Sequence, residues 1–292
     1  MGRAGGQPPA APVPVRLRPH VSAMFGYRAH GLEPGVHRGL PSPGLTLVLS
    51  LGRPLVTAPD ARAWDAGVRD RQWVSLGGLH TEAAMVENPG WWAGVQLTLH
   101  PLGLRRLLGV PAADLPVGSW DAADLLGGEV DRVAEELGAA RCWSARYAVV
   151  HAFLARLQER AGRAAEPPPP RPEVRQAWRL LTAGTPPTVD EVAREVGYSR
   201  RRLGELFAAE VGHGPKTVQR LARFDAARRA VPLAAARGAP LATVAAAAGY
   251  CDQSHLVREF RQYAGLSPTR WLAAELPNVQ APAGPAAPPW DA

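Results

Sequence analysis

The sequence is poor in the residues that would build a disulfide framework, a cysteine zinc site or a membrane span. Its two cysteines, Cys142 and Cys251, lie far apart and in no paired spacing. We therefore expect neither a disulfide nor a cysteine-bound metal, and two unpaired thiols are typical of a reducing cytoplasm. No apolar run reaches the roughly 18 residues that a membrane-spanning helix requires, so no membrane partner is expected.

Lysine is also scarce, which limits what the basic residues mean. Lys216 is the only lysine among 33 basic residues, and alanine, glycine and proline are abundant, a pattern that indicates a GC-rich genome. Arginine content alone is therefore uninformative, but its distribution is not. Residues 171–275 hold 16 basic and 10 acidic side chains, whereas the rest of the chain holds 17 and 16. This local excess favours a polyanionic partner, although a solvated basic face would give the same balance.

A proline-rich run, Pro167 to Pro170 with Pro172 beyond it, divides the chain into two parts. Such a run is stiff and extended, so it acts as a spacer. The alanine- and proline-rich ends are typical of disordered segments. The predicted organisation is a disordered start over 1–15, a domain over 16–160, a linker over 161–172, a second domain over 173–276 and a disordered tail over 277–292.

Short apolar runs separated by glycine and proline precede the linker. Leu45–Leu51, Trp73–Leu76 and Val95–Leu99 have the pattern of strands. From Pro101 the leucine spacing becomes helical, and a longer helix is predicted over 144–160. We therefore predict the α+β class, with a β-barrel-like N-terminal domain closed by helices and an all-α C-terminal domain.

The C-terminal part contains an internal repeat. The first copy reads TVDEVAREVGYSRRRLGELFAAEVGHGP from Thr188, and the second reads PLATVAAAAGYCDQSHLVREFRQYAGLSP from Pro240. The offset is 52 residues before the central turn and 53 after it, because the second copy has one extra residue. The residues that recur are Val192, Ala193, Gly197 and Tyr198 as Val244, Ala245, Gly249 and Tyr250, and then Leu203, Phe207, Gly212 and Pro215 as Leu256, Phe260, Gly265 and Pro268.

Each copy has the spacing of a helix-turn-helix unit. Apolar residues at i, i+3, i+4 and i+7 give the first helix one buried face. Gly197 and Gly249 end that helix where the chain can turn left-handed. Ser199 can then cap the second helix of the first copy. A single such pattern also fits an ordinary helix pair, but two copies in a basic segment favour DNA binding. A connecting helix from Pro215 to about Arg229 would let the two second helices enter successive major grooves, roughly 34 Å apart.

The candidate DNA-contacting residues lie on the outward faces of these second helices. Arginine and glutamine can read base edges in the major groove with paired hydrogen bonds. In the first copy the candidates are Arg200, Arg201, Arg202 and Glu205. In the second copy they are Gln253, Ser254, His255 and Arg258. Gly197, Gly212, Gly249, Gly265 and Pro268 are the predicted turn residues.

At these residues the chain resembles the DNA-binding domain of the AraC/XylS family of bacterial transcription regulators. The stretches RLARFDAARRA and GYCDQSHLVREFRQYAGLSPTRW carry the resemblance, which covers residues 174–276. It implies a seven-helix domain that binds promoter DNA as two helix-turn-helix units, with the distal unit close to RNA polymerase. The stretch GVQLTLHPLGLRRLLGVPAADL from Gly94 resembles sensor domains of actinobacterial members more faintly. It implies a cupin-related barrel that senses a small-molecule effector or mediates association into a homodimer.

The first copy departs from the family pattern. It has Gly204 and Glu205 where members often carry a polar residue and an arginine. Glu205 can accept a hydrogen bond from cytosine N4 or simply face solvent. We therefore expect Arg200–Arg202 to grip phosphates, and the second copy to read bases directly.

No catalytic residue, metal or cofactor is predicted. The histidines before the linker show no close pair with a carboxylate, so surface or loop positions are expected for them. Trp91 and Trp92 fit a pocket wall or core packing. These histidines are His20, His30, His37, His80, His100 and His151.

Two rival functions remain open. One is a DNA-repair enzyme of the alkyl-transfer type, which would need a reactive cysteine. Cys142 has basic neighbours but no partner ligands in the sequence, so a non-enzyme is expected. The other is an interaction protein whose helix-turn-helix units no longer bind DNA.

Overall fold

The computed structural model describes residues 8–9, 11–116, 118–163 and 168–275, and within them the predicted α+β class is confirmed. Strands occur only before the proline-rich run in this described part, and the segment after it is helical. The strands are β1 (Val21–His30), β2 (Gly35–Gly39), β3 (Leu45–Ser50), β4 (Leu55–Ala58), β5 (Asp70–Gln72), β6 (Val74–Gly77), β7 (Ala84–Asn88), β8 (Trp91–Leu99) and β9 (Ser119–Asp121). The α-helices of this part are α1 (Ala61–Asp65), α2 (Leu104–Leu108), α3 (Ala123–Leu126), α4 (Glu129–Ala139) and α5 (Trp143–Arg163), and the 3-10 helices are Val15–Leu17, Pro101–Gly103 and Ala112–Asp114.

The strands form two antiparallel sheets rather than one closed barrel. One sheet has the order β1-β8-β3-β6-β9 and the other the order β2-β7-β4-β5. Among the described residues no strand of one sheet pairs with a strand of the other. The alternation along β3 explains its place, because Leu45, Leu47 and Leu49 are buried on one face. The N-terminal domain, predicted to be β-barrel-like, is therefore built from two facing sheets.

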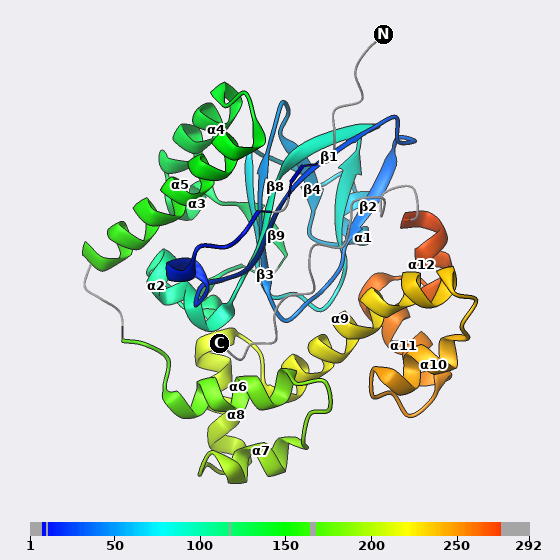
Figure 1. The fold of residues 1–292 in the computed structure, drawn as a ribbon. Coiled ribbons are helices and arrows are strands. Elements are labelled where there is room, and N and C mark those ends of the chain that lie inside the picture. The colour runs from blue at the N-terminus through cyan, green and yellow to red at the C-terminus, as the bar shows by residue number, and fades with distance from the viewer. Residues whose placement is uncertain (1–7, 10, 117, 164–167, 276–292) are drawn as a thin grey trace.

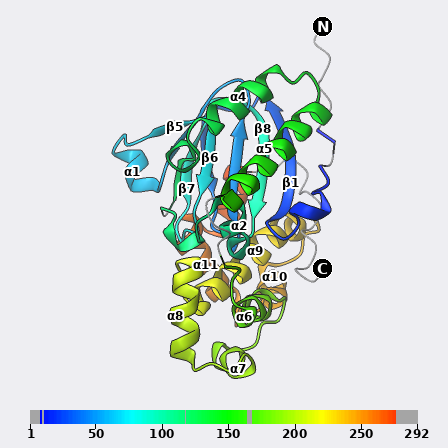
Figure 2. The same ribbon diagram turned by 90° about the vertical axis from the view of Figure 1, so that its left-hand side faces the viewer.

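Helices cover the outer face of the five-stranded sheet. Gly26 of β1 makes room for α5, since a Cβ atom there would come within 2.5 Å of the Trp143 ring. The Gly26 amide donates to the Tyr147 hydroxyl, which itself donates to the carbonyl of Pro9. The layers thus run from α3–α5 through the five-stranded sheet to the four-stranded sheet (Figures 1 and 2). None of the described helices is long and apolar enough to cross a membrane.

The segment after the proline-rich run folds into helices in the described range 172–275. The 22-residue helix α9 joins two groups, α6–α8 at one end and α10–α12 at the other (Figure 1). This arrangement agrees with the seven helices that the family resemblance implies. The helices are α6 (Pro172–Thr182), α7 (Val189–Glu195), α8 (Arg200–Val211), α9 (Pro215–Ala236), α10 (Leu241–Ala247), α11 (Gln253–Ala264) and α12 (Pro268–Glu275).

Two apolar clusters hold the molecule together. The first spans both parts of the chain: the Trp178 ring of α6 stacks on Phe207 of α8 and also touches His100, which follows β8. The second cluster is built by α9–α12, and Leu40 is the residue of the sheet domain that packs against it in the described part. The first helix-turn-helix group therefore shares one apolar core with the sheet domain, whereas the second group has a cluster of its own that the sheet domain contacts through Leu40.

The domain boundaries remain predictions. Helix α5 runs to Arg163 and α6 begins at Pro172, so helix flanks the predicted linker closely. Within the predicted disordered start, Ala11 is buried and Pro9 accepts the hydrogen bond from α5. The predicted tail over 277–292 lies outside the described residues.

Candidate nucleic-acid interface

The first helix-turn-helix unit consists of α7, a left-handed turn and α8. Thr188 and Glu191 form a reciprocal capping box at the start of α7. Gly197 has φ +74°, which reverses the chain, and the Ser199 side chain then accepts the Arg202 amide to begin α8. The helices pack through Val192, Ala193, Leu203 and Phe207, all buried.

The second unit repeats this construction with α10 and α11. Gly249 has φ +76°, and Gly265, which ends α11, has φ +70°. The α11 cap is Asp252, whose carboxylate accepts the His255 amide at 2.7 Å. Sequence reasoning missed this cap. The signal was the 53-residue offset, which aligns Asp252 with Ser199.

On the first unit, the predicted arginines are exposed and already paired with carboxylates. Arg200 contacts Asp190 of α7 at 3.2 Å, and Arg201 and Arg202 both reach Glu205, at 3.6 and 3.1 Å. Exposed pairs of this kind contribute only about 0–1 kcal/mol, so the arginines can exchange these partners for phosphates at little cost. Because Glu205 pairs with two of these arginines, it neutralises part of the positive charge of this surface.

On the second unit, the exposed face carries polar groups with fewer partners. Gln253, Ser254 and Arg258 are exposed, and Arg258 makes no ion pair with any residue that the structure describes. His255 is different: it is half-buried, and its ring meets the Tyr250 ring edge-on at 5.1 Å. Three of the four predicted residues of this unit therefore share an open surface, and the fourth borders the turn.

Sequence reasoning also missed a buried ion pair behind this surface. Glu259 of α11 lies within hydrogen-bond distance of Arg220 and Arg223 on α9. The signal was available, because Glu259 follows Leu256 by three residues and precedes Tyr263 by four, which places it on the apolar face of the helix.

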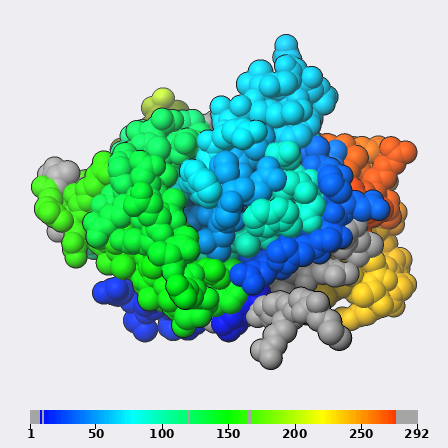
Figure 3. Space-filling model, turned by 90° about the horizontal axis from the view of Figure 1, so that it is seen from above, coloured from blue at the N-terminus to red at the C-terminus, as the bar shows by residue number. Residues whose placement is uncertain are grey.

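The sheet domain holds both ends of the DNA-binding segment. At the first unit, Arg105 of α2 donates to the two carboxylate oxygens of Glu210, and the His213 ring donates to the Leu79 carbonyl. At the second unit, the buried Glu275 carboxylate contacts the His37 ring at 2.6 Å and accepts the Arg38 amide of β2 at 3.0 Å. Seen from above, the second unit, in orange and red, projects beside the dark blue N-terminal strands (Figure 3).

Two histidines are held neutral where the sheet domain meets the first unit, which we call the junction: His100, whose ring touches Trp178, and the nearby His20. Burial, and to a lesser extent the nearby His20, lower the pKa of His100 to about 4. Its Nδ1 accepts the Leu102 amide at 3.1 Å, a role that the protonated nitrogen cannot fill. Burial also lowers the pKa of His20, whose Nδ1 contacts the Gly103 carbonyl. In the described part of the chain no group of His, Cys, Asp or Glu is arranged to hold a metal ion.

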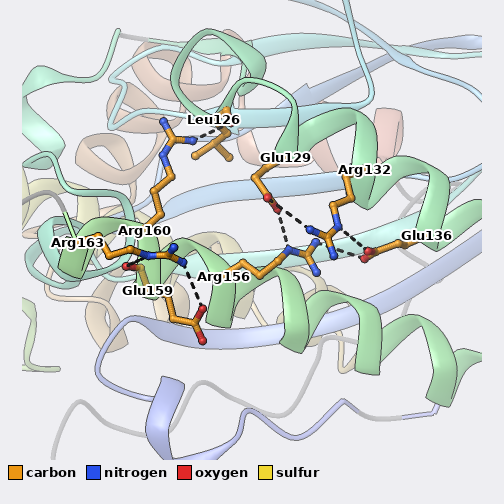
Figure 4. Close-up of polar contacts among 8 residues, drawn as sticks. All are labelled: Leu126, Glu129, Arg132, Glu136, Arg156, Glu159, Arg160 and Arg163. Carbon is orange, nitrogen blue, oxygen red and sulfur yellow. Dashed lines mark hydrogen bonds and ion pairs between the residues drawn. The ribbon is translucent and has the colours of Figure 1, made fainter.

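Helices α4 and α5 enclose an open groove of about 420 Å³ on the outside of the sheet domain. Its arginines are already paired: Arg156 and Arg132 bridge Glu129 and Glu136, and Arg160 donates to the carbonyls at the end of α3 (Figure 4). This mixed network joins α3, α4 and α5 and has no cluster of one charge. Cys142, just before α5, is exposed, with its Sγ 3.2 Å from Ser144 Oγ.

Comparison with known proteins identifies the C-terminal segment. A family model described as a helix-turn-helix domain matches residues 192–274. No curated protein matches the chain. The structure is similar to that of ToxT from Vibrio cholerae, with a TM-score of 0.50 and 9% identity over 86% of this chain and 97% of ToxT. A second ToxT structure, from strain O395, has (E)-4-(8-methylnaphthalen-1-yl)but-3-enoic acid bound. It matches with a TM-score of 0.50 and 11% identity over 86% of this chain and 97% of ToxT. A regulator with an AraC-type DNA-binding domain from Chromobacterium violaceum matches 35% of this chain and 90% of its own, at 25% identity and TM-score 0.32.

Proposed function

We propose that this chain, whose C-terminal part matches a helix-turn-helix family model and whose fold is similar to that of ToxT, is an AraC-type regulator that controls transcription by reading promoter DNA with both units at once. One observation carries the proposal. Two units of the same construction are joined by the single helix α9, and each presents a polar, exposed face on its second helix. A continuous helix fixes their separation, which suits successive major grooves of one duplex.

Modulation by the sheet domain is the second part of the proposal. Contacts from that domain reach both units, through Glu210 and His213 at one end and Glu275 at the other. A change in the sheets can therefore be transmitted directly to both units. Since one ToxT structure holds a small carboxylic acid, we propose a small-molecule effector or a partner protein as the input here. RNA polymerase and a second copy of the chain are the proposed protein partners.

A shift assay with the full chain tests DNA binding. The full chain is the right material because the first unit shares its apolar cluster with the sheet domain. Promoter fragments from the source genome should be bound with an affinity that falls steeply as salt rises, because arginines displace counterions from phosphates. Genome-wide mapping of bound sites would then give the operator. A chain that binds no DNA at low salt would instead fit an interaction protein, and the proposal would fail.

A further inference from the structure

A buried carboxylate lies on the side of helix α11, the second helix of the second unit, that packs against α9. Glu259 belongs to α11, which also carries Gln253 and Arg258, but its own side chain is only 4% exposed. It lies on the face that packs against α9. Burying a charge is costly unless partners compensate it, so its presence there calls for a reason.

The partners of Glu259 are two arginines of α9. Its Oε1 accepts from Arg220 Nε at 2.8 Å and from Arg223 Nη2 at 2.7 Å. Arg220 also donates to Gln262 at 2.6 Å, and the Arg223 guanidinium lies over the ring of Tyr250, which follows the turn. Burial works to raise the pKa of Glu259, but the hydrogen bonds from Arg223 and Arg220 outweigh it and hold the pKa below its usual value. The pair therefore stays charged at neutral pH.

The first unit shows that a helix-turn-helix unit does not need this pair. The 53-residue offset aligns Glu259 with Leu206, a half-buried apolar residue of α8. The first unit therefore folds with leucine where the second has a buried carboxylate. Replacing a buried ion pair by apolar groups is often neutral for stability, so stability alone does not account for Glu259.

Orientation is the property that an ion pair supplies and apolar packing does not. Around Glu259, rings of α9 and α11 are in contact, such as Phe224 with Phe260 and Tyr263, and the hydrophobic effect that favours their burial is non-directional. Short charge-assisted hydrogen bonds fix direction as well as distance. Arg258 directly precedes Glu259, so whatever fixes the rotation of α11 about its axis also fixes the direction of Arg258.

Resting on the proposed function, we propose that Glu259 is a positioning residue: held by Arg220 and Arg223, it sets the rotation of α11 so that Gln253 and Arg258 meet their bases. It does not contact DNA. It determines the sequence preference of the second unit through the residues beside it.

The test is a sequence-selection experiment on the full chain, comparing the wild type with E259L, which copies the first unit. The preferred bases under the second unit should lose roughly tenfold of their preference, since one good base contact discriminates by about that factor. The bases under the first unit should keep theirs, and the variant should still fold, at a lower melting temperature because the largely buried Arg223 loses its carboxylate partner. R223Q should reduce the base preference at the same positions, because it removes one of the two partners of Glu259. Arg223 lies on α9 and is largely buried, so this change leaves the exposed face of α11 untouched.

The matched control is R261Q, which removes a charge from the exposed side of α11 without touching α9. It should weaken binding to all sequences alike and leave the preference intact. Unchanged preference in both E259L and R223Q would overturn the inference. If E259L loses its melting transition, E259Q decides: flattened preference in a folded E259Q supports positioning, whereas an unfolded E259Q makes Glu259 a stability residue and overturns it. A wild type that selects no sequence would refute the proposed function itself, which is a separate result.

Discussion

At the scale of single residues, helices α8 and α11 differ in whether a carboxylate pairs with their exposed arginines. Arg202 is tied to Glu205, whereas Arg258 has no acidic partner among the described residues. Arg202 sits beside a carboxylate that repels phosphates, whereas the exposed face around Arg258 carries the uncharged Gln253 and Ser254. We therefore assign different roles to the two side chains.

Arg258→Ala should relax preference at one or two operator positions and cost about 1–3 kcal/mol on the cognate site, because a paired hydrogen bond to a base is lost. Arg202→Ala should weaken cognate and random DNA nearly alike and reduce the salt slope by about one unit. A shift assay on both variants at matched salt measures these effects. If Arg202→Ala changes preference and Arg258→Ala does not, the two roles are reversed.

The neutral histidine at the junction makes stability depend on pH. The folded-state pKa of His100, about 4, lies below the ordinary value near 6.5. The neutral form is therefore favoured on folding, and its contribution is complete above about pH 6.5 and is lost as the pH falls toward 4. The melting temperature should drop over this window, and less steeply in His100→Gln, whose amide oxygen can still accept the Leu102 amide. An equal slope in both proteins would show that His100 is not a titrating group of the transition.

At the scale of elements, the turn glycines can be tested against a glycine inside a helix. Gly197 and Gly249 have positive φ, and no atom lies where their Cβ atoms would point. Valine at either position should destabilise the fold by about 1–3 kcal/mol through backbone strain alone. Gly204, in the middle of α8 and also in open space, is the control: Gly204→Ala should stabilise by about 0.5–1 kcal/mol. Thermal unfolding measures all three, and a Gly197→Val variant as stable as the wild type would disprove the turn geometry.

The elements also show how far the sequence could be interpreted. The strong apolar runs became β3, β6 and β8, and the repeat gave α7, α8, α10 and α11, because both signals are local. Strand β5 (Asp70–Gln72) was not predicted, since its first two residues are exposed and charged and only pairing with β4 makes it a strand. The separation into two sheets was missed for the same reason: it depends on pairing between distant segments. At the site, the exposed candidates could be predicted from their residue types. The pairing of Glu259 with Arg220 and Arg223 could not, because it depends on how α9 packs against α11.

At the scale of the whole molecule, the second unit is tied to the sheet domain by few contacts. Glu275 of α12 is its polar anchor, held by His37 and the Arg38 amide of β2. Glu275→Gln keeps an acceptor for the amide but removes the charge that faces His37. Hydrogen exchange should therefore quicken in α12 and β2 while α6–α8 keep their protection.

The control is Glu195→Gln, at an exposed carboxylate of the first unit. It should leave exchange in α12 and β2 unchanged. Equal protection of α12 in Glu275→Gln and the wild type would mean that apolar contact with Leu40 alone holds the second unit in place.

The way the two apolar clusters divide helix α9 decides where this protein could be recombined with a relative. Val218 belongs to the cluster shared with the sheet domain, and Leu221, one turn later, begins the cluster of the second unit. A chimera joined at the proline-rich run would part Trp178 from its partner beyond β8 and expose an apolar surface on both fragments. A chimera joined inside α9, after Val218, would carry a complete apolar cluster in each parent piece. Exchanging the residues from Arg220 onward keeps Arg220 and Arg223 with Glu259, so it should transfer the reading of DNA by the second unit to a new parent, with the sheet domain and the first unit left intact.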